Sequence, residues 1–210
     1  MILLGYIAEI VYGEPLDGLF ERYIKKPLGL TRSRFNIAID ESNTADCFER
    51  EHIGKLRVDD SNVYNMGGVA GSGASFWCLA DLERFAESVM NKSEAVYSAD
   101  MYAAAEKNYT LSCKKTGSYE DRGLGWQIAG EKPMDTGELF PRDGSTFGHT
   151  EWTGVGVFFN RKSDSYAIVL TNASRYNNIR SGFKAYDFMD THRVRRDILN
   201  AIQADLKITQ

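Results

Sequence analysis

The hydrophobic residues of this 210-residue chain recur first with a helical period. Apolar positions three or four residues apart occupy 3–11 and 16–24, and a third such pattern lies at 79–90. Pro27 is expected to end the second helix. A stripe within 187–206 predicts a long C-terminal helix with one apolar face, made of Val194, Ile198, Leu199, Ile202 and Leu206.

Between the third and fourth helical patterns the period changes to two. Strands are expected at roughly 145–150, 153–160 and 165–172. Apolar positions alternate with other residues in the second and third of these segments. A shorter strand is expected at 123–128, where two glycines precede Trp126.

The order of these elements predicts the fold class. The chain runs from helices to an antiparallel sheet and then to a helix, which is typical of an α+β protein. We expect a mainly helical part over 1–122. The sheet strands and the C-terminal helix are expected over 123–210.

Composition and charge exclude several classes of function. A net charge of −4, without a long Lys/Arg run, argues against a nucleic-acid partner. No apolar run is long enough to span a membrane. Residues 1–10 are apolar, but Glu9 interrupts them and they lack the basic start of a signal peptide. We therefore expect an amphipathic core helix there, and the localisation stays open.

No metal or cofactor is expected from the sequence. The three histidines lie far apart and the three cysteines have no metal-ligand spacing. These residues are His52, His149 and His192, with Cys47, Cys78 and Cys113.

A polar segment lies between two of the expected strands. It reads Phe147-Gly148-His149-Thr150-Glu151-Trp152-Thr153-Gly154. It resembles the third motif, Lys-Thr-Gly or His-Thr-Gly, of the serine β-lactamase and penicillin-binding-protein-like hydrolases. That family includes class C β-lactamases, D-alanyl-D-alanine carboxypeptidases and esterases.

Further segments resemble the same family and follow its order. Residues 3–13 resemble the helix after its Tyr-x-Asn motif, and residues 27–30 resemble its Pro-Leu-Gly-Met turn. Residues 58–71 resemble the Val-His-Asp-x-Asn-Ala-Tyr-x-x-Gly-Gly-x-Ala-Gly stretch of its esterase and carboxypeptidase branch. Residues 168–172 resemble its Leu-Thr-Asn strand. The resemblance thus covers nearly the whole chain.

The resemblance implies a β-lactamase/transpeptidase-like fold, with an antiparallel sheet packed on a helical subdomain. It also implies acyl transfer through a serine ester, with lysine and tyrosine activating the serine and an oxyanion hole stabilising the intermediate. His149 and Thr150 would flank the substrate carboxylate and support proton transfer. The backbone N–H of Trp152 would be an oxyanion donor.

The chain departs from the family pattern in several places. The Ser-x-x-Lys and Tyr-x-Asn motifs precede the opening helix in the family, and this sequence does not supply them. Glu151 stands where the family has glycine, and Asp59 where it has histidine. Residues 112–115 match Ser-x-x-Lys in form and residues 115–117 match Lys-Thr-Gly. One lysine, Lys115, cannot serve both motifs, so we interpret this match as coincidence.

Six residues are candidates for the site. The catalytic candidates are His149 and Thr150, and the substrate-binding candidates are Glu151, Trp152, Tyr64 and Asn62. The alternative is structural: a histidine held by a hydrogen bond, an exposed carboxylate, a packed tryptophan, and two side chains that pin a loop.

We therefore expect the C-terminal part of a β-lactamase-like serine hydrolase that lacks the N-terminal strands and nucleophile helix and is inactive alone. Its substrate would be a peptidoglycan peptide, a β-lactam or an ester. The alternative is a non-catalytic remnant that serves as a binding or interaction module. The expected partner is an N-terminal fragment of the same hydrolase, or a second copy joined through the outer edge of the strand from Ser165 to Asn172.

Overall fold

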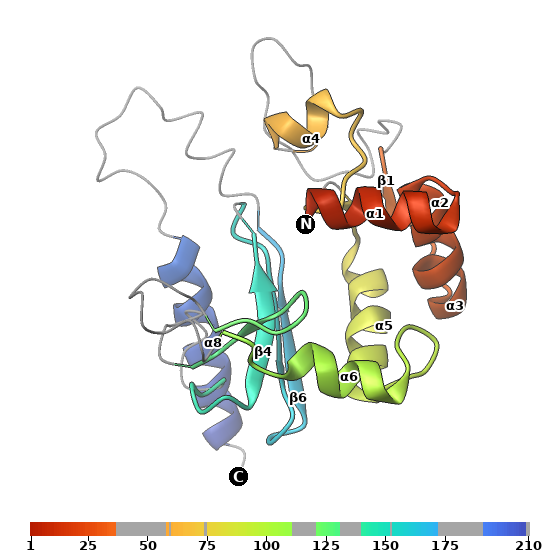
Figure 1. Ribbon diagram of the computed structural model, residues 1–210. Coiled ribbons are helices and arrows are strands. Elements are labelled where there is room, and N and C mark those ends of the chain that lie inside the picture. Colours follow the sequence, from red (N-terminus) through yellow and green to blue (C-terminus); the bar gives the residue numbers. More distant parts are fainter. Residues whose placement is uncertain are drawn as a thin grey trace, which may run out of the picture. The chain divides into compact units, whose positions relative to one another are not determined.

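The computed structural model describes most of the chain (Figure 1). The described residues are 1–36, 58, 60–73, 75–110, 121–130, 140–151, 153–171 and 191–208. They fall into two units, Met1–Ser88 and Val89–Gln210, and each unit is described by itself. The boundary near residue 122 that the sequence suggests stays a prediction.

The first unit opens with a run of helices: α1 (Ile2–Tyr12), α2 (Leu16–Phe20), the π-helical turn η1 (Glu21–Lys25) and α3 (Lys26–Leu28). α1 ends at Gly13, whose positive φ of 63° suits a residue without a Cβ. The second helical stretch continues past Pro27 to Leu28, so the expectation that Pro27 ends it is wrong. Proline is tolerated in the first turn of α3, and the left-handed Gly29 ends the helix instead.

α1 forms where its helical period predicts, but it is not a core helix. Its only buried residue is Gly5. A Cβ at this position would lie 2.9 Å from the backbone nitrogen of Gly71, so the two backbones approach closely here. Its large apolar side chains are exposed. The expectation of a buried amphipathic helix is therefore wrong for the described residues, because α1 is apolar on nearly every side and only one side is covered.

The rest of the first unit packs around an aromatic chain. Strands β1 (Arg34–Phe35) and β2 (Ser75–Phe76) pair antiparallel, and α4 (Ser61–Asn65) lies between them in sequence. Four rings make consecutive edge-to-face contacts with centroids 5.5–5.7 Å apart, in the order Phe35, Phe20, Trp77 and Phe85. Phe85 belongs to α5 (Leu79–Met90), so these rings join α2 to α5.

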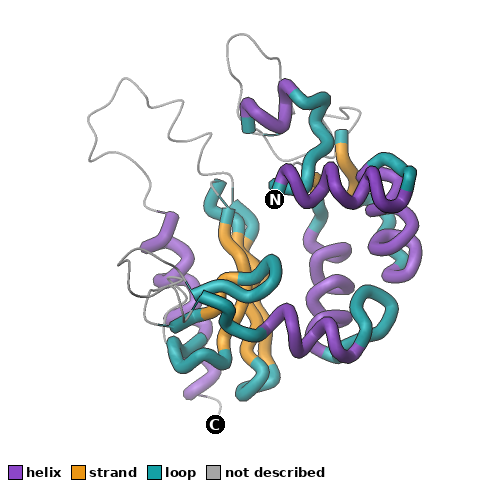
Figure 2. The backbone as a smooth tube through the Cα atoms, in the orientation of Figure 1, coloured by secondary structure: helices purple, strands orange, loops and turns teal. Residues whose placement is uncertain are grey.

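The second unit holds the antiparallel sheet. The strands β3 (Gln127–Ile128), β4 (Thr146–Thr150), β5 (Gly156–Asn160) and β6 (Ser165–Val169) pair in chain order. α6 (Ala99–Glu106) precedes the sheet and α8 (Thr191–Ile208) follows it. Figure 2 shows the four strands in orange beside α8. The predicted α+β class is confirmed, with strands a few residues shorter than expected.

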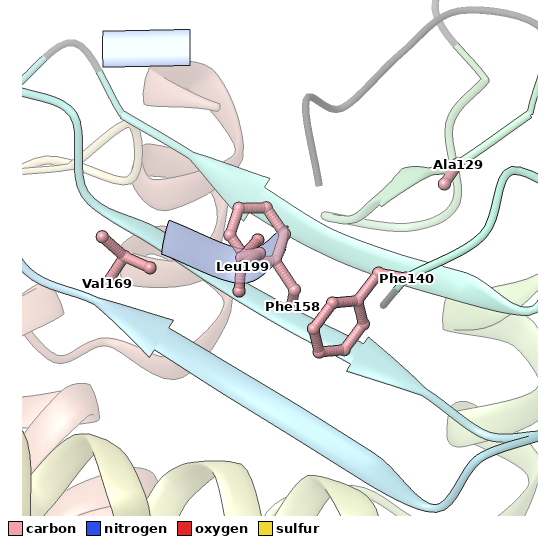
Figure 3. Packing of buried hydrophobic residues seen from close by; sticks show 5 residues of the cluster. All are labelled: Ala129, Phe140, Phe158, Val169 and Leu199. Carbon is pink, nitrogen blue, oxygen red and sulfur yellow. The ribbon is translucent and has the colours of Figure 1, made fainter. Parts of the chain in front are cut away.

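α8 covers the sheet with a face that differs from the predicted stripe. Leu199 is fully buried in a cluster with sheet residues and their flanking segments (Figure 3): Ala129, Phe140, Phe158 and Val169. Arg195, one turn earlier, is also buried, whereas Ile198 and Ile202 are at least 40% exposed. The helix is thus turned so that the Arg195 and Leu199 side meets the sheet. No helix of the described residues is long and apolar enough to cross a membrane.

Candidate active site

β4 is a central strand of the sheet, and its C-terminal end carries the polar segment. It pairs with β3 on one side and with β5 on the other, so its backbone is held from both sides. Thr146, Phe147 and Gly148 are buried, while His149 and Thr150 are half-buried. Burial therefore changes along the strand, and the two catalytic candidates lie where the strand reaches the surface.

Gly148 is required by the close approach of the neighbouring strand. A Cβ at this position would overlap the carbonyl oxygen of Val157 and come within 3.0 Å of the Phe158 Cα. Because both are backbone atoms of β5, they cannot move aside without breaking the ladder. The residue before His149 is thus fixed by packing, and this packing sets the position of the strand end.

The turn after β4 is held by contacts from three places. The Glu151 N–H donates to the Val155 carbonyl at 2.9 Å, and the Gly154 N–H donates to the Glu151 carbonyl at 3.0 Å. Gly154 has φ +91°, which favours glycine. Two residues distant in sequence also bond this turn. Thr171 Oγ1 donates to the Thr153 carbonyl at 2.7 Å, and Arg195 Nη1 donates to the Gly154 carbonyl at 3.0 Å.

His149 has a partner at each ring nitrogen. Nδ1 lies 2.8 Å from the carbonyl oxygen of Thr150, and Nε2 lies 3.2 Å from Nη1 of Arg122. A carbonyl can only accept and a guanidinium can only donate. These partners therefore place a hydrogen on Nδ1 and leave Nε2 to accept from Arg122. To act as a base through Nε2, His149 would have to release Arg122.

Glu151 directly follows β4 and lies beside His149. Its Oε1 lies 3.6 Å from Nδ1 of His149, and its side chain is 57% exposed. In this exposed setting the carboxylate competes with water for any partner. Thr150 is half-buried and pairs with Gly156 in the ladder. The strand end thus presents an imidazole, a hydroxyl and a carboxylate on consecutive residues.

Arg122 contacts the candidate site, although the sequence pattern did not point to it. Its backbone is fixed by the Thr110 hydroxyl, which accepts from its N–H at 3.0 Å, and by the Tyr109 N–H, which donates to its carbonyl at 2.8 Å. It directly precedes the glycine-rich segment before β3, and that adjacency was the available signal. Its contact with His149 joins residues 27 positions apart.

Asn62 and Tyr64 lie in the first unit, on α4. The helix is capped by Asp60, whose Oδ1 accepts from the Asn62 N–H at 2.8 Å and from the Val63 N–H at 3.1 Å. Asn62 and Tyr64 are both exposed, while Val63 between them is fully buried. The structure thus gives Asn62 and Tyr64 surface positions on a capped short helix, and their binding role stays a prediction.

Several residues that the family resemblance singles out lie outside the described part of the chain. They are Trp152 with its oxyanion N–H, Asp59, and the coincidental motif at Ser112 and Lys115. Within the described residues, no group of three or more His, Cys, Asp or Glu side chains could hold a metal ion.

Known proteins match this chain in sequence. The Beta-lactamase family model matches residues 1–183. A protein of Escherichia coli K12, named "Putative D-alanyl-D-alanine carboxypeptidase", is 29% identical over 189 residues, which cover 81% of this chain and 43% of the relative.

Solved structures of other proteins share the fold of this chain. A β-lactamase from Mycobacterium bovis superposes with a TM-score of 0.61 at 23% identity, covering 96% of this chain and 60% of that one. An octameric penicillin-binding protein homologue from Pyrococcus abyssi gives 0.59 at 20% identity, covering 89% and 42%. The chain thus spans less than half the length of the curated relatives it matches, and it corresponds to their C-terminal part. By the match over most of its length, this chain belongs to the β-lactamase family.

Proposed function

We propose that this chain is the C-terminal part of a serine hydrolase and supplies one wall of its acyl-transfer site. The observation that carries the proposal is the end of β4, where His149 and Thr150 become accessible beside a turn held by Thr171 and Arg195. A rigid strand end is suited to orienting a substrate, because precise placement lowers the barrier to acyl transfer.

Each residue of the strand end has a proposed role. The Thr150 hydroxyl binds the carboxylate of the substrate, and His149 supports proton transfer beside it. The N–H of Trp152 donates to the oxyanion, an interaction that is worth about 3 kcal/mol in complete enzymes. The name of the Escherichia coli relative favours a peptidoglycan peptide over a simple ester as the substrate.

The nucleophile is proposed to lie on an N-terminal part of the hydrolase. A chimera tests this, in which the chain replaces the matched part of the Escherichia coli relative. The chimera should be labelled covalently by a fluorescent penicillin or a fluorophosphonate. Thr150→Val should reduce the labelling rate about tenfold or more while leaving the fold intact. A folded chimera that neither reagent labels would contradict the proposal.

The chain alone should not form an acyl-enzyme. Mass spectrometry after exposure to a β-lactam or a fluorophosphonate checks this directly. A stoichiometric adduct on Ser112, or on any other serine, would show that a nucleophile is present after all. Lys115→Ala then decides whether the segment at 112–115 acts as a true Ser-x-x-Lys motif.

One observation favours the second candidate, a non-catalytic binding module. Both ring nitrogens of His149 are engaged, with Arg122 and with the Thr150 carbonyl. In such a module these contacts would hold the strand end as a fixed docking surface. Arg122→Gln in the chimera separates the two roles. A faster labelling rate favours a histidine that must be released for catalysis, and an unchanged rate favours a structural histidine.

A further inference from the structure

The surface of α1 has a chemistry that the proposed function does not use. Seven large apolar side chains lie on this 11-residue helix, and each is 45–71% exposed. We call them the α1 apolar surface: Leu3, Leu4, Tyr6, Ile7, Ile10, Val11 and Tyr12. A helix that is hydrophobic on nearly every side is normally buried.

α1 is attached to the first unit along one side. Gly5 approaches the backbone of Gly71, and Oε1 of Glu9 accepts from the Leu16 N–H at 2.9 Å. Glu9 is the only charged side chain of α1, and it faces this attachment rather than the opposite side. The α1 apolar surface is therefore free of charge.

Leaving this surface in water is costly. Burying a large aliphatic or aromatic side chain stabilises a protein because apolar area is removed from water, and seven such side chains are exposed here. An isolated helix of this length is also marginal in water. A contiguous exposed surface of this kind marks a docking site, whereas single exposed hydrophobic residues would not.

The features of the surface select one occupant. Helices that lie on membranes carry Lys or Arg on a polar face, and α1 has neither residue. The Escherichia coli relative is matched over 43% of its length, so more than half of such a hydrolase lies outside the matched part. We infer that the α1 apolar surface docks the N-terminal part of the same hydrolase through an uncharged, apolar face.

This inference rests on the proposed function, and it predicts a difference between the chain and the chimera described above. Val11→Glu should leave the thermal midpoint of the chain alone nearly unchanged, because Val11 is 71% exposed there. In the chimera the same change should lower the midpoint by about 5 °C or more, because a charge is then buried without a partner. Ile10→Glu should behave in the same way.

A matched control is Leu79→Glu, because Leu79 is an exposed apolar residue of the same unit outside α1. It should change the midpoint of the chain and of the chimera equally. Equal effects of Val11→Glu in the two proteins would overturn the inference. So would a dimer of the chain alone that Val11→Glu converts to monomers, because a second copy would then be the occupant. A chimera that is destabilised by Val11→Glu but never labelled by penicillin would keep the docking and reject the hydrolase.

Discussion

Among single residues, Asp81 shows how one carboxylate can fasten two distant segments. It is 1% exposed in the first turn of α5. Its oxygens accept from the backbone N–H groups of Thr31, Arg32 and Ser33 at 2.8–3.0 Å, and from the Ser33 hydroxyl at 2.8 Å. Burial by itself would raise the pKa of Asp81, but these hydrogen bonds outweigh it and hold the pKa well below its ordinary value.

Asp81→Asn should therefore destabilise the first unit in a pH-dependent way. The contribution of a carboxylate with a depressed pKa is complete above its unfolded value near 4 and is lost as the pH falls toward the folded value. We expect a loss of about 2 kcal/mol at pH 7 and a clearly smaller loss at pH 3, from urea unfolding. Ser33→Ala, which removes one hydrogen bond, is the milder control. A loss that is the same at both pH values would contradict this account.

Arg161 has a similar role in the second unit. Its guanidinium donates to the carbonyls of Met90 and Val89 at 2.6 and 2.8 Å and to Glu106 at 2.5 and 3.1 Å. It also lies over the ring of Phe147 in β4, 5.3 Å from the centroid. One side chain therefore joins the ends of α5 and α6 to the strand that carries the site.

Arg161→Met should lower the free energy of unfolding by about 3 kcal/mol, because it leaves Glu106 and two carbonyls without this partner. The next residue provides a matched control. Lys162 pairs with Asp143 at 3.0 Å but is 75% exposed, so Lys162→Met should cost less than about 1 kcal/mol. Urea unfolding followed by circular dichroism measures both. Similar losses for the two variants would mean that the Arg161 contacts contribute little.

Glu151 is the residue by which this strand end differs most from the family pattern. Its carboxylate adds bulk and negative charge beside His149, where the proposed function places the carboxylate of the substrate. Glu151→Gly should strengthen weak penicillin binding about tenfold, as measured by ligand-observed NMR. Glu151→Gln keeps the bulk and removes the charge, so it separates the two causes. Equal binding by all three proteins would exclude any blocking by Glu151.

At the scale of elements, the sequence predicted which segments form helices and strands better than it predicted what covers them. Alternation identified β5 and β6, because successive side chains of a strand point to opposite faces of the sheet. The helical period of α1 and α8 was also correct. Periodicity does not specify the partner of a face, so the exposure of α1 and the buried Arg195 were not anticipated.

The sequence also pointed to only some of the residues around the candidate site. His149 and Thr150 were proposed as site residues from the sequence because their motif is contiguous. Arg122, Thr171 and Arg195 were not, because they reach the β4 end from 18–41 positions away along the chain. Such contacts depend on the folded topology, which a single sequence pattern does not contain.

The outer edge of β6 is the element expected to join the chain to a partner. Within the described residues β6 pairs with β5 alone, so one side of its backbone has no ladder. Such an edge can recruit another strand. We predict that the chain alone associates through β6, as measured by size-exclusion chromatography with light scattering.

Two neighbouring proline substitutions test this edge. Successive N–H groups of a strand point to opposite sides, so either Ile168 or Val169 directs its N–H outward. Proline at the outward position should weaken association and keep the sheet, while proline at the inward position should unfold it. A wild-type chain that stays monomeric at high concentration would defeat the prediction.

At the scale of the whole molecule, stability should be distributed unevenly along the chain. α1 and α5 have 11 and 12 residues, so length does not distinguish them. α5 buries Leu82, Ala86 and Val89, whereas α1 buries only Gly5. Since local opening is governed by buried contacts, amides of α1 should exchange about 100-fold faster than those of α5 in the chain alone. In the chimera, where the α1 apolar surface is proposed to be covered, α1 should approach the protection of α5. Hydrogen exchange with mass spectrometry measures both, and equal protection of the two helices in the chain alone would show that α1 needs no covering partner.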